Sequence, residues 1–100
     1  MNLKEVNEQL EDLMPEYIKA QEEYSKFMYE YDNYKAKFSL SGTTLGLGNQ
    51  TMRDAEVMRR LDVEGLLEKK LKISSKFYRL KTKKEFLFEL SSNLRTIGAK

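Results

Sequence analysis

The 100-residue chain contains no cysteine and no histidine, and it has only one proline. Without cysteine the chain forms no disulfide and offers no thiolate, and without histidine it lacks the commonest general base and metal ligand. Metal sites in the cores of helical bundles combine inward-facing glutamates with a Glu-x-x-His motif, which also requires histidine. We therefore expect no metal and no cofactor.

Pairs of carboxylates are the remaining candidates for catalysis, because some enzymes use two of them as acid and base. The pairs Glu11–Asp12 and Glu22–Glu23 are consecutive in the sequence. On a helix, consecutive side chains point to different faces and cannot converge on one bond. We predict that the protein is not an enzyme.

Long apolar runs are also absent. No window approaches the about 18 continuous apolar residues that a membrane span needs, and the first residues show no basic segment followed by an apolar run. We expect a cytoplasmic protein without a membrane partner. The composition, 34% charged and 40% hydrophobic, is typical of a soluble helical protein, and the length fits one helical domain over residues 1–100.

Apolar residues at intervals of seven predict a long helix at about residues 63–97. The repeat consists of Leu66, Ile73, Leu80, Leu87 and Leu94. Such a repeat keeps one seam of the helix facing a partner helix, as in coiled coils. Phe77, which we also expect on the seam, Phe86 and Phe88 lie outside this repeat and give the helix more apolar surface than one partner helix can cover. We therefore expect several chains to assemble into a bundle.

The same spacing in the first third of the chain predicts a helix at about residues 3–37. From residue 17 onward its repeat is mostly aromatic, and the side chains expected in the core or the oligomer seam are Tyr17, Tyr24, Phe27 and Tyr31, with Tyr34 on the same stripe. Packing against another helix explains these rings better than stacking on nucleobases does. Pro15 predicts either a kink or a separate short helix before it, and the continuous repeat favours the kink.

Residues 39–50 separate the two long helices. They carry no charge and contain three of the five glycines, which predicts a flexible connection. Asn49 follows the last of these glycines, where a phosphate-binding loop requires a lysine. Thr51 and Asp54 resemble a capping box and predict a short helix at about 52–61, while Asp62 is the expected cap of the long helix.

Charge is distributed unevenly between the two halves. Residues 1–37 carry nine acids and five bases, a net charge of −4, whereas residues 51–100 carry seven acids and thirteen bases, a net charge of +6. Opposite charges favour antiparallel docking of the two long helices, and any excess positive field is available to a partner.

The strongest basic feature is the segment 69–84, which holds eight bases and no acid. The candidate nucleic-acid contacts are Lys69, Lys70, Lys72, Lys76, Arg79, Lys81, Lys83 and Lys84. On a helix these bases suit phosphate contacts, or they form a solvated face opposite the acids of the first helix. A membrane-surface helix fits the lysines but not the acids on either side of them. Lys70 and Lys84 share the heptad position of Phe77, where polar residues fix register or partner number.

Several short runs in the second half of the chain resemble small all-helical proteins of tailed bacteriophages. The resemblance covers roughly residues 20–95 and rests on Thr51–Glu56, Leu61–Glu64, Tyr78–Lys81 and Asn93–Arg95. This chain has Val63 where that family commonly has a proline after the aspartate. Genes of that family often lie among early genes for DNA replication and recombination, so the resemblance implies a phage setting and the cytoplasm of the host. It implies no catalytic motif.

Together these patterns predict an all-α protein in which a long antiparallel helical hairpin with a short intervening helix assembles into an oligomeric helical bundle. The expected function is non-enzymatic interaction or assembly, with further copies of the chain and with a host or phage protein as the partner classes. The alternative is a nucleic-acid-binding accessory factor of phage DNA replication or recombination that uses residues 69–84.

Overall fold

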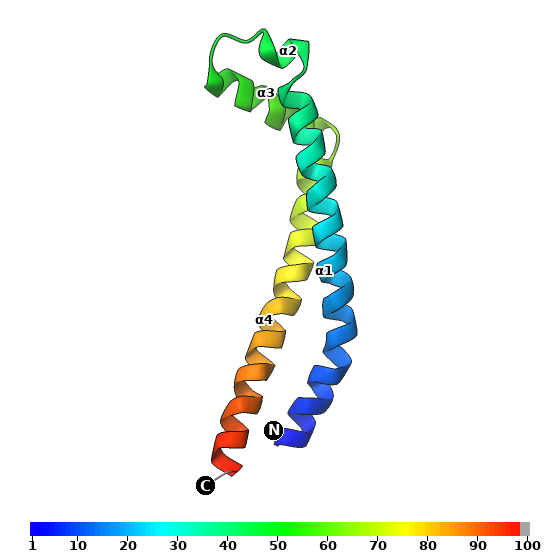
Figure 1. Cartoon of the computed structure of the whole chain (residues 1–100), viewed down its shortest axis with the longest axis vertical. Coiled ribbons are helices and arrows are strands. Elements are labelled where there is room, and N and C mark those ends of the chain that lie inside the picture. The colour runs from blue at the N-terminus through cyan, green and yellow to red at the C-terminus, as the bar shows by residue number, and fades with distance from the viewer. Residues whose placement is uncertain (99–100) are drawn as a thin grey trace. The chain divides into compact units, whose positions relative to one another are not determined.

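The computed structural model describes residues 1–98, and this part of the chain forms four helices joined by short turns, without strands. Its elements are α1 (Leu3–Ser39), α2 (Gly42–Leu45), α3 (Gln50–Val63) and α4 (Leu66–Gly98). The two long helices, α1 and α4, pack against each other (Figure 1). The predicted all-α fold with a long helix pair is therefore confirmed.

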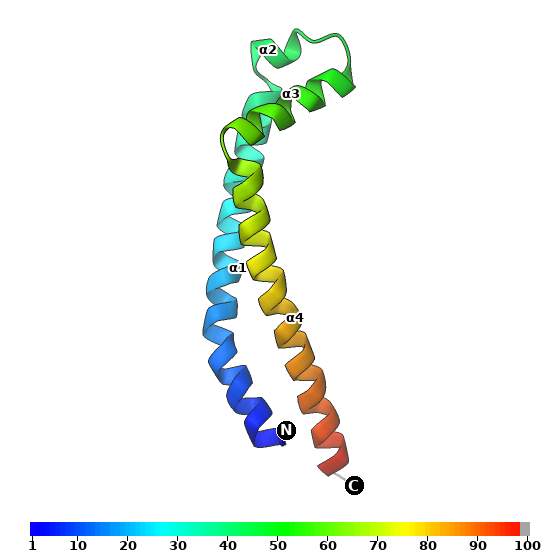
Figure 2. The same cartoon turned by 180° about the vertical axis from the view of Figure 1, so that it is seen from behind.

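The chain forms two compact units, and both long helices contribute to each. Unit 1 combines Met1–Tyr24 with the residues from Ser74 onward, and unit 2 spans Ser25–Ile73. Within unit 1 the two helices run antiparallel, because Asn7 contacts Ser91 near the chain ends while Tyr24 contacts Tyr78 further along. Figure 2 shows the N-terminal part of α1 beside the C-terminal part of α4.

The heptad positions of the two helices build the core of unit 1. Its buried side chains are Val6, Leu10, Leu13, Tyr17 and Ala20 from α1, with Phe77, Leu80 and Leu87 from α4. Residues three or four apart lie on one side of a helix, so this spacing gives each helix a single apolar stripe toward its neighbour. The stripe excludes water along the length of the pair in this unit.

Unit 2 has a separate core to which α3 contributes. Its buried side chains are Phe27, Tyr31 and Phe38 of α1 with Val57 and Leu61 of α3. The four-residue spacing of Val57 and Leu61 places both on one face of α3. The Arg60 guanidinium lies 4.9 Å from the centre of the Phe38 ring and covers this core from outside.

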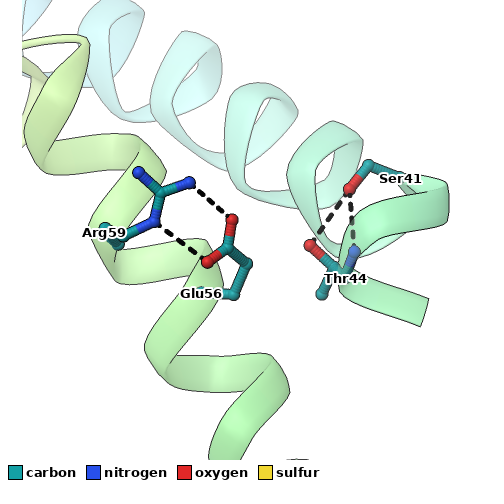
Figure 3. A network of polar contacts seen from close by, with 4 residues as sticks. All are labelled: Ser41, Thr44, Glu56 and Arg59. Atoms are coloured by element: carbon teal, nitrogen blue, oxygen red, sulfur yellow. Dashed lines mark hydrogen bonds and ion pairs between the residues drawn. The ribbon is translucent and has the colours of Figure 1, made fainter. Parts of the chain in front are cut away.

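The connection between α1 and α3 contains a short helix, α2, that the sequence patterns do not predict. Ser41 caps α2 by accepting a hydrogen bond from the Thr44 backbone N–H at 3.3 Å, and its hydroxyl donates to the Thr44 hydroxyl at 3.0 Å (Figure 3). Thr44 is buried.

The same view shows Arg59 of α3 forming two hydrogen bonds with Glu56, which lower the pKa of that carboxyl.

The structure corrects the expected start of α3. This helix begins at Gln50 and is capped by Asn49, whose side chain accepts a hydrogen bond from the Met52 backbone N–H at 2.8 Å. Asp54 instead accepts a hydrogen bond from the Gln50 side chain at 2.7 Å. Thr51 is thus a helical residue and not the cap, because the Asn49 carboxamide oxygen already accepts from the Met52 backbone donor in the first turn.

The boundary between α3 and α4 also differs from the expectation. Asp62 lies inside α3, and the turn falls at Gly65, whose φ of 73° is the left-handed conformation that glycine adopts without strain. The Gly65 N–H donates to the Asp62 carbonyl at 2.9 Å, and its carbonyl accepts from the Lys69 N–H at 3.1 Å. Gly65 therefore ends one helix and starts the next.

Two features of α1 bear on the sequence predictions for this helix. The helix runs without interruption from Leu3 to Ser39 with Pro15 inside it, so a separate short helix before the proline is wrong. Tyr34, which shares the heptad stripe, is exposed and not packed in the core. Phe38, four residues further along, is buried again against Val57 and Leu61 of α3, and Tyr34 lies beside its ring with the centres 6.0 Å apart.

We expect Leu87→Ala to lower the free energy of unfolding by about 2–5 kcal/mol, because the leucine is 2% exposed and its removal leaves a cavity. Leu71→Ala, at a leucine of the same helix that is 68% exposed, is the control and should change it by less than about 0.5 kcal/mol. Urea unfolding followed by circular dichroism measures both. Equal effects of the two substitutions would contradict the assignment of the core.

We expect Gly65→Ala to destabilise the fold by about 1–2 kcal/mol, because an L-residue is strained at this positive φ. Space is not the cause, since a side chain at Gly65 meets no atom within 4 Å. Gly65→Asn should cost less because asparagine tolerates the left-handed conformation, and Gly48→Ala, which also meets no atom within 4 Å, is the control. Equal melting temperatures for the alanine variants at 65 and 48 would contradict this role.

Candidate functional site

All eight bases of the predicted contact segment lie on α4, and they are divided between the two units. Lys69, Lys70 and Lys72 belong to unit 2. The bases in unit 1 are Lys76, Arg79, Lys81, Lys83 and Lys84. We therefore consider the environment of the bases within each unit.

Four of the lysines lie over aromatic rings. In unit 2 the Lys69 ammonium is 5.3 Å from the centre of the Phe27 ring, and the Lys70 ammonium is 4.6 Å from that of Tyr31. In unit 1, Lys84 lies 4.1 Å from Tyr17 and Lys81 lies 5.9 Å from Tyr78. A cation over a ring face is attracted by the ring quadrupole while the lysine stem packs on the ring.

Contact with a tyrosine ring explains how Lys70 and Lys84 can lie on the seam. In unit 1, Phe77 stacks on Tyr24 with ring centres 4.7 Å apart, and Lys84, seven residues later, lies on Tyr17, seven residues earlier. In unit 2, Lys70 meets Tyr31 in the same way. A lysine on this position is compatible with the helix pair because a tyrosine ring, and not an aliphatic side chain, faces it.

Two other lysines are paired with carboxylates. Lys72 lies 3.2 Å from Glu68 on the same helix, and Lys76 lies 3.8 Å from Glu23 of α1. The Lys76–Glu23 pair realises part of the predicted docking against the acidic helix. Both pairs are exposed to solvent, so each contributes little to stability. Within residues 1–98, the side chains of Arg79 and Lys83 form no ion pair.

The side chains predicted for the seam lie at the interface of the helices. Tyr17, Phe27, Tyr31, Phe77, Leu80 and Leu87 are buried, and Tyr24, Leu66, Ile73 and Leu94 are half-buried. The Tyr24 and Tyr78 hydroxyls are 3.4 Å apart, and this hydrogen bond, together with burial, raises the pKa of Tyr24. A role of these residues between chains stays a prediction.

A cleft of about 340 Å³ in unit 1 brings bases from both helices together. It is lined by Glu16 and Lys19 of α1 and by Lys76, Arg79 and Leu80 of α4. Lys19 lies outside the basic segment that the sequence singles out. In the sequence, Lys19 is marked only by its position. It comes two residues after the core residue Tyr17 and lies on the same flank of α1 as Glu16 and Glu23.

The end of α4 carries large apolar side chains that α1 does not cover. Phe86, Phe88 and Ile97 are 61%, 53% and 67% exposed, while Leu87 between the two phenylalanines is buried. Leu71 and Tyr78 are exposed on other turns of the same helix. Apolar residues therefore surround α4 instead of forming only the stripe that faces α1.

The described residues contain neither a metal cluster nor a membrane-spanning helix. In residues 1–98, no three acidic side chains gather in a way that would hold a metal ion. No helix within the same range is both long and apolar enough to span a membrane. Comparison with protein-family models, with curated proteins and with solved structures found no match to this chain.

A double-mutant cycle tests the contact between Lys84 and Tyr17. We expect Lys84→Met and Tyr17→Leu to be coupled by about 0.5–1 kcal/mol in unfolding free energy, because the ammonium lies over the ring face. The cycle of Lys83→Met with Tyr17→Leu is the matched control and should show no coupling. The contact would be ruled out as an energetic interaction if the two cycles gave the same coupling energy in urea unfolding.

Proposed function

We propose that this protein acts by binding and not by catalysis, as an assembly protein whose α4 helices join several chains into a helical bundle. The observation that carries this proposal is the exposure of Phe86, Phe88 and Ile97 on a helix whose inner side already packs on α1. Large apolar side chains gain free energy when they leave water. A neighbouring chain supplies the cover that α1 cannot.

The exposed side chains flank the packed seam on both sides. Phe86 and Ile97 follow one side of α4, with the half-buried Leu90 between them in the same row, whereas Phe88 falls on the other side of Leu87. In a bundle of helical hairpins each helix has two neighbours, which corresponds to apolar residues on both flanks of its core stripe. This pattern favours a bundle over a simple pairing of two flat surfaces.

The resemblance to small phage proteins supports a setting in which such an assembly engages a phage or host protein. In that setting the bundle provides several identical surfaces, so a weak contact is multiplied by the number of chains. The proposed place of action is the cytoplasm of the host cell.

Nucleic-acid binding through residues 69–84 is the second candidate function. Arg79 and Lys83 favour it, because both are exposed and neither is engaged by an acid in the described part of the chain. Phosphate contacts of this kind release counterions, so affinity would fall steeply with salt.

The assembly proposal predicts a mass that is a multiple of one chain. Light scattering after gel filtration should show this multiple over the micromolar range, and Phe86→Ser with Phe88→Ser should reduce it, because two phenylalanines no longer need cover. Tyr29→Ser, at an aromatic residue of α1 in unit 2 that is also exposed, is the control. The mass of a single chain throughout that range would overturn the proposal.

The second candidate predicts binding of DNA or RNA oligonucleotides that weakens between about 50 and 200 mM salt. Sequence preference should be weak, because seven of the eight bases are lysines, which do not read base edges with a planar fork. Fluorescence anisotropy with single- and double-stranded DNA and RNA measures both properties. Absence of binding to all four at the lowest salt would leave assembly as the function.

A further inference from the structure

We infer that the cleft of unit 1 is a binding site for a phosphate group of a nucleic-acid backbone, held by Lys19, Lys76 and Arg79. This inference rests on the second candidate function and names the site at which it acts. It also adds a residue of α1, Lys19, to a surface that the sequence assigns to α4 alone. Two helices that approach each other are needed to build it.

The arrangement of the bases suits an anion. Lys76 and Arg79 are three residues apart on α4 and therefore lie on one side of that helix. Lys19 lines the same cleft from α1, so positive groups enter the site from two directions. Arginine presents a planar fork of donors that matches two phosphate oxygens, while lysine adds a point charge.

The charges around the cleft leave it positive. Its lining contains three bases and one acid, Glu16. Glu23 lies 3.8 Å from Lys76, but both side chains are nearly half exposed, so solvent screens this pair and an incoming anion can compete for the ammonium. Leu80 lines the cleft next to these bases and supplies its apolar wall.

The bases continue along α4 beyond the cleft, which favours a polymer over a lone phosphate ion. Lys83 is four residues beyond Arg79 on the same side of the helix, about 6 Å further along its axis. A nucleic-acid strand carries a phosphate on every nucleotide and can contact both positions, whereas a single phosphate ion engages the cleft alone. The ligand of the cleft is therefore a phosphodiester backbone.

The test compares variants in anisotropy titrations of a fluorescent single-stranded oligonucleotide at about 50 mM salt. We expect Arg79→Gln and Lys19→Gln each to weaken binding about tenfold and to reduce the slope of log affinity against log salt by about one. Arg95→Gln is the matched control for Arg79, because Arg95 is an exposed arginine of the same helix and unit outside the cleft. It should leave binding unchanged.

A gain of affinity provides a second criterion. Glu16→Gln removes the one carboxylate that lines the cleft, so it should tighten binding severalfold. Glu22→Gln, at an exposed acid of α1 outside the cleft, should not. A substitution that merely disturbed the fold would not improve binding, and circular dichroism of each variant checks that the helices are intact.

The possible outcomes distinguish failure of the cleft as the binding site from failure of nucleic-acid binding as the function. Loss with Arg79→Gln and Lys19→Gln, together with gain from Glu16→Gln, supports the cleft. Binding that responds equally to Arg95→Gln overturns the cleft and leaves nucleic-acid binding through the whole basic segment. Absence of oligonucleotide binding overturns both the inference and the second candidate function, and a parallel titration with inorganic pyrophosphate then shows whether the cleft takes free phosphate groups instead.

Discussion

The antiparallel packing of aromatic rings of α1 against α4 is the constraint on which the rest of the molecule depends. Tyr24 lies flat on Phe77, with 11° between the ring planes, and fixes which residues of the two helices face each other in unit 1. Large rings bury much apolar area and favour offset stacking, so a shift by one turn would lose both. The buried leucines then fall opposite each other as a consequence of this alignment.

The same rings explain how a helix with eight bases in one segment packs at all. An ammonium on a helix seam normally has to reach water or an acid. Here Lys84 and Lys70 each lie on a tyrosine ring of α1, so the aromatic stripe accommodates lysines and Phe77 at equivalent positions. Part of the basic segment is therefore structural. Within residues 1–98, Arg79 and Lys83 are the bases of the segment that lie over no ring and form no ion pair.

The candidate site could be predicted only in part. The segment 69–84 is visible in the sequence as a run of bases, but its members separate into those over rings, those paired with acids and those exposed to solvent. That division depends on what each position meets across the interface. Lys19 could not be assigned to the site from the sequence, because it becomes a neighbour of Arg79 only when α1 and α4 align.

The sequence by itself determined the two long helices and their apolar stripes. Heptad spacing is a local property of the sequence, and residues at this spacing lie on one face of a helix whatever surrounds it. The sequence also excluded cysteine and histidine chemistry. The tertiary structure decided the features that depend on contacts between distant residues: the alignment of Tyr24 with Phe77, the cap by Asn49, the left-handed turn at Gly65 and the exposure of Tyr34. For each of these features the sequence offers several suitable residues, and packing selects among them.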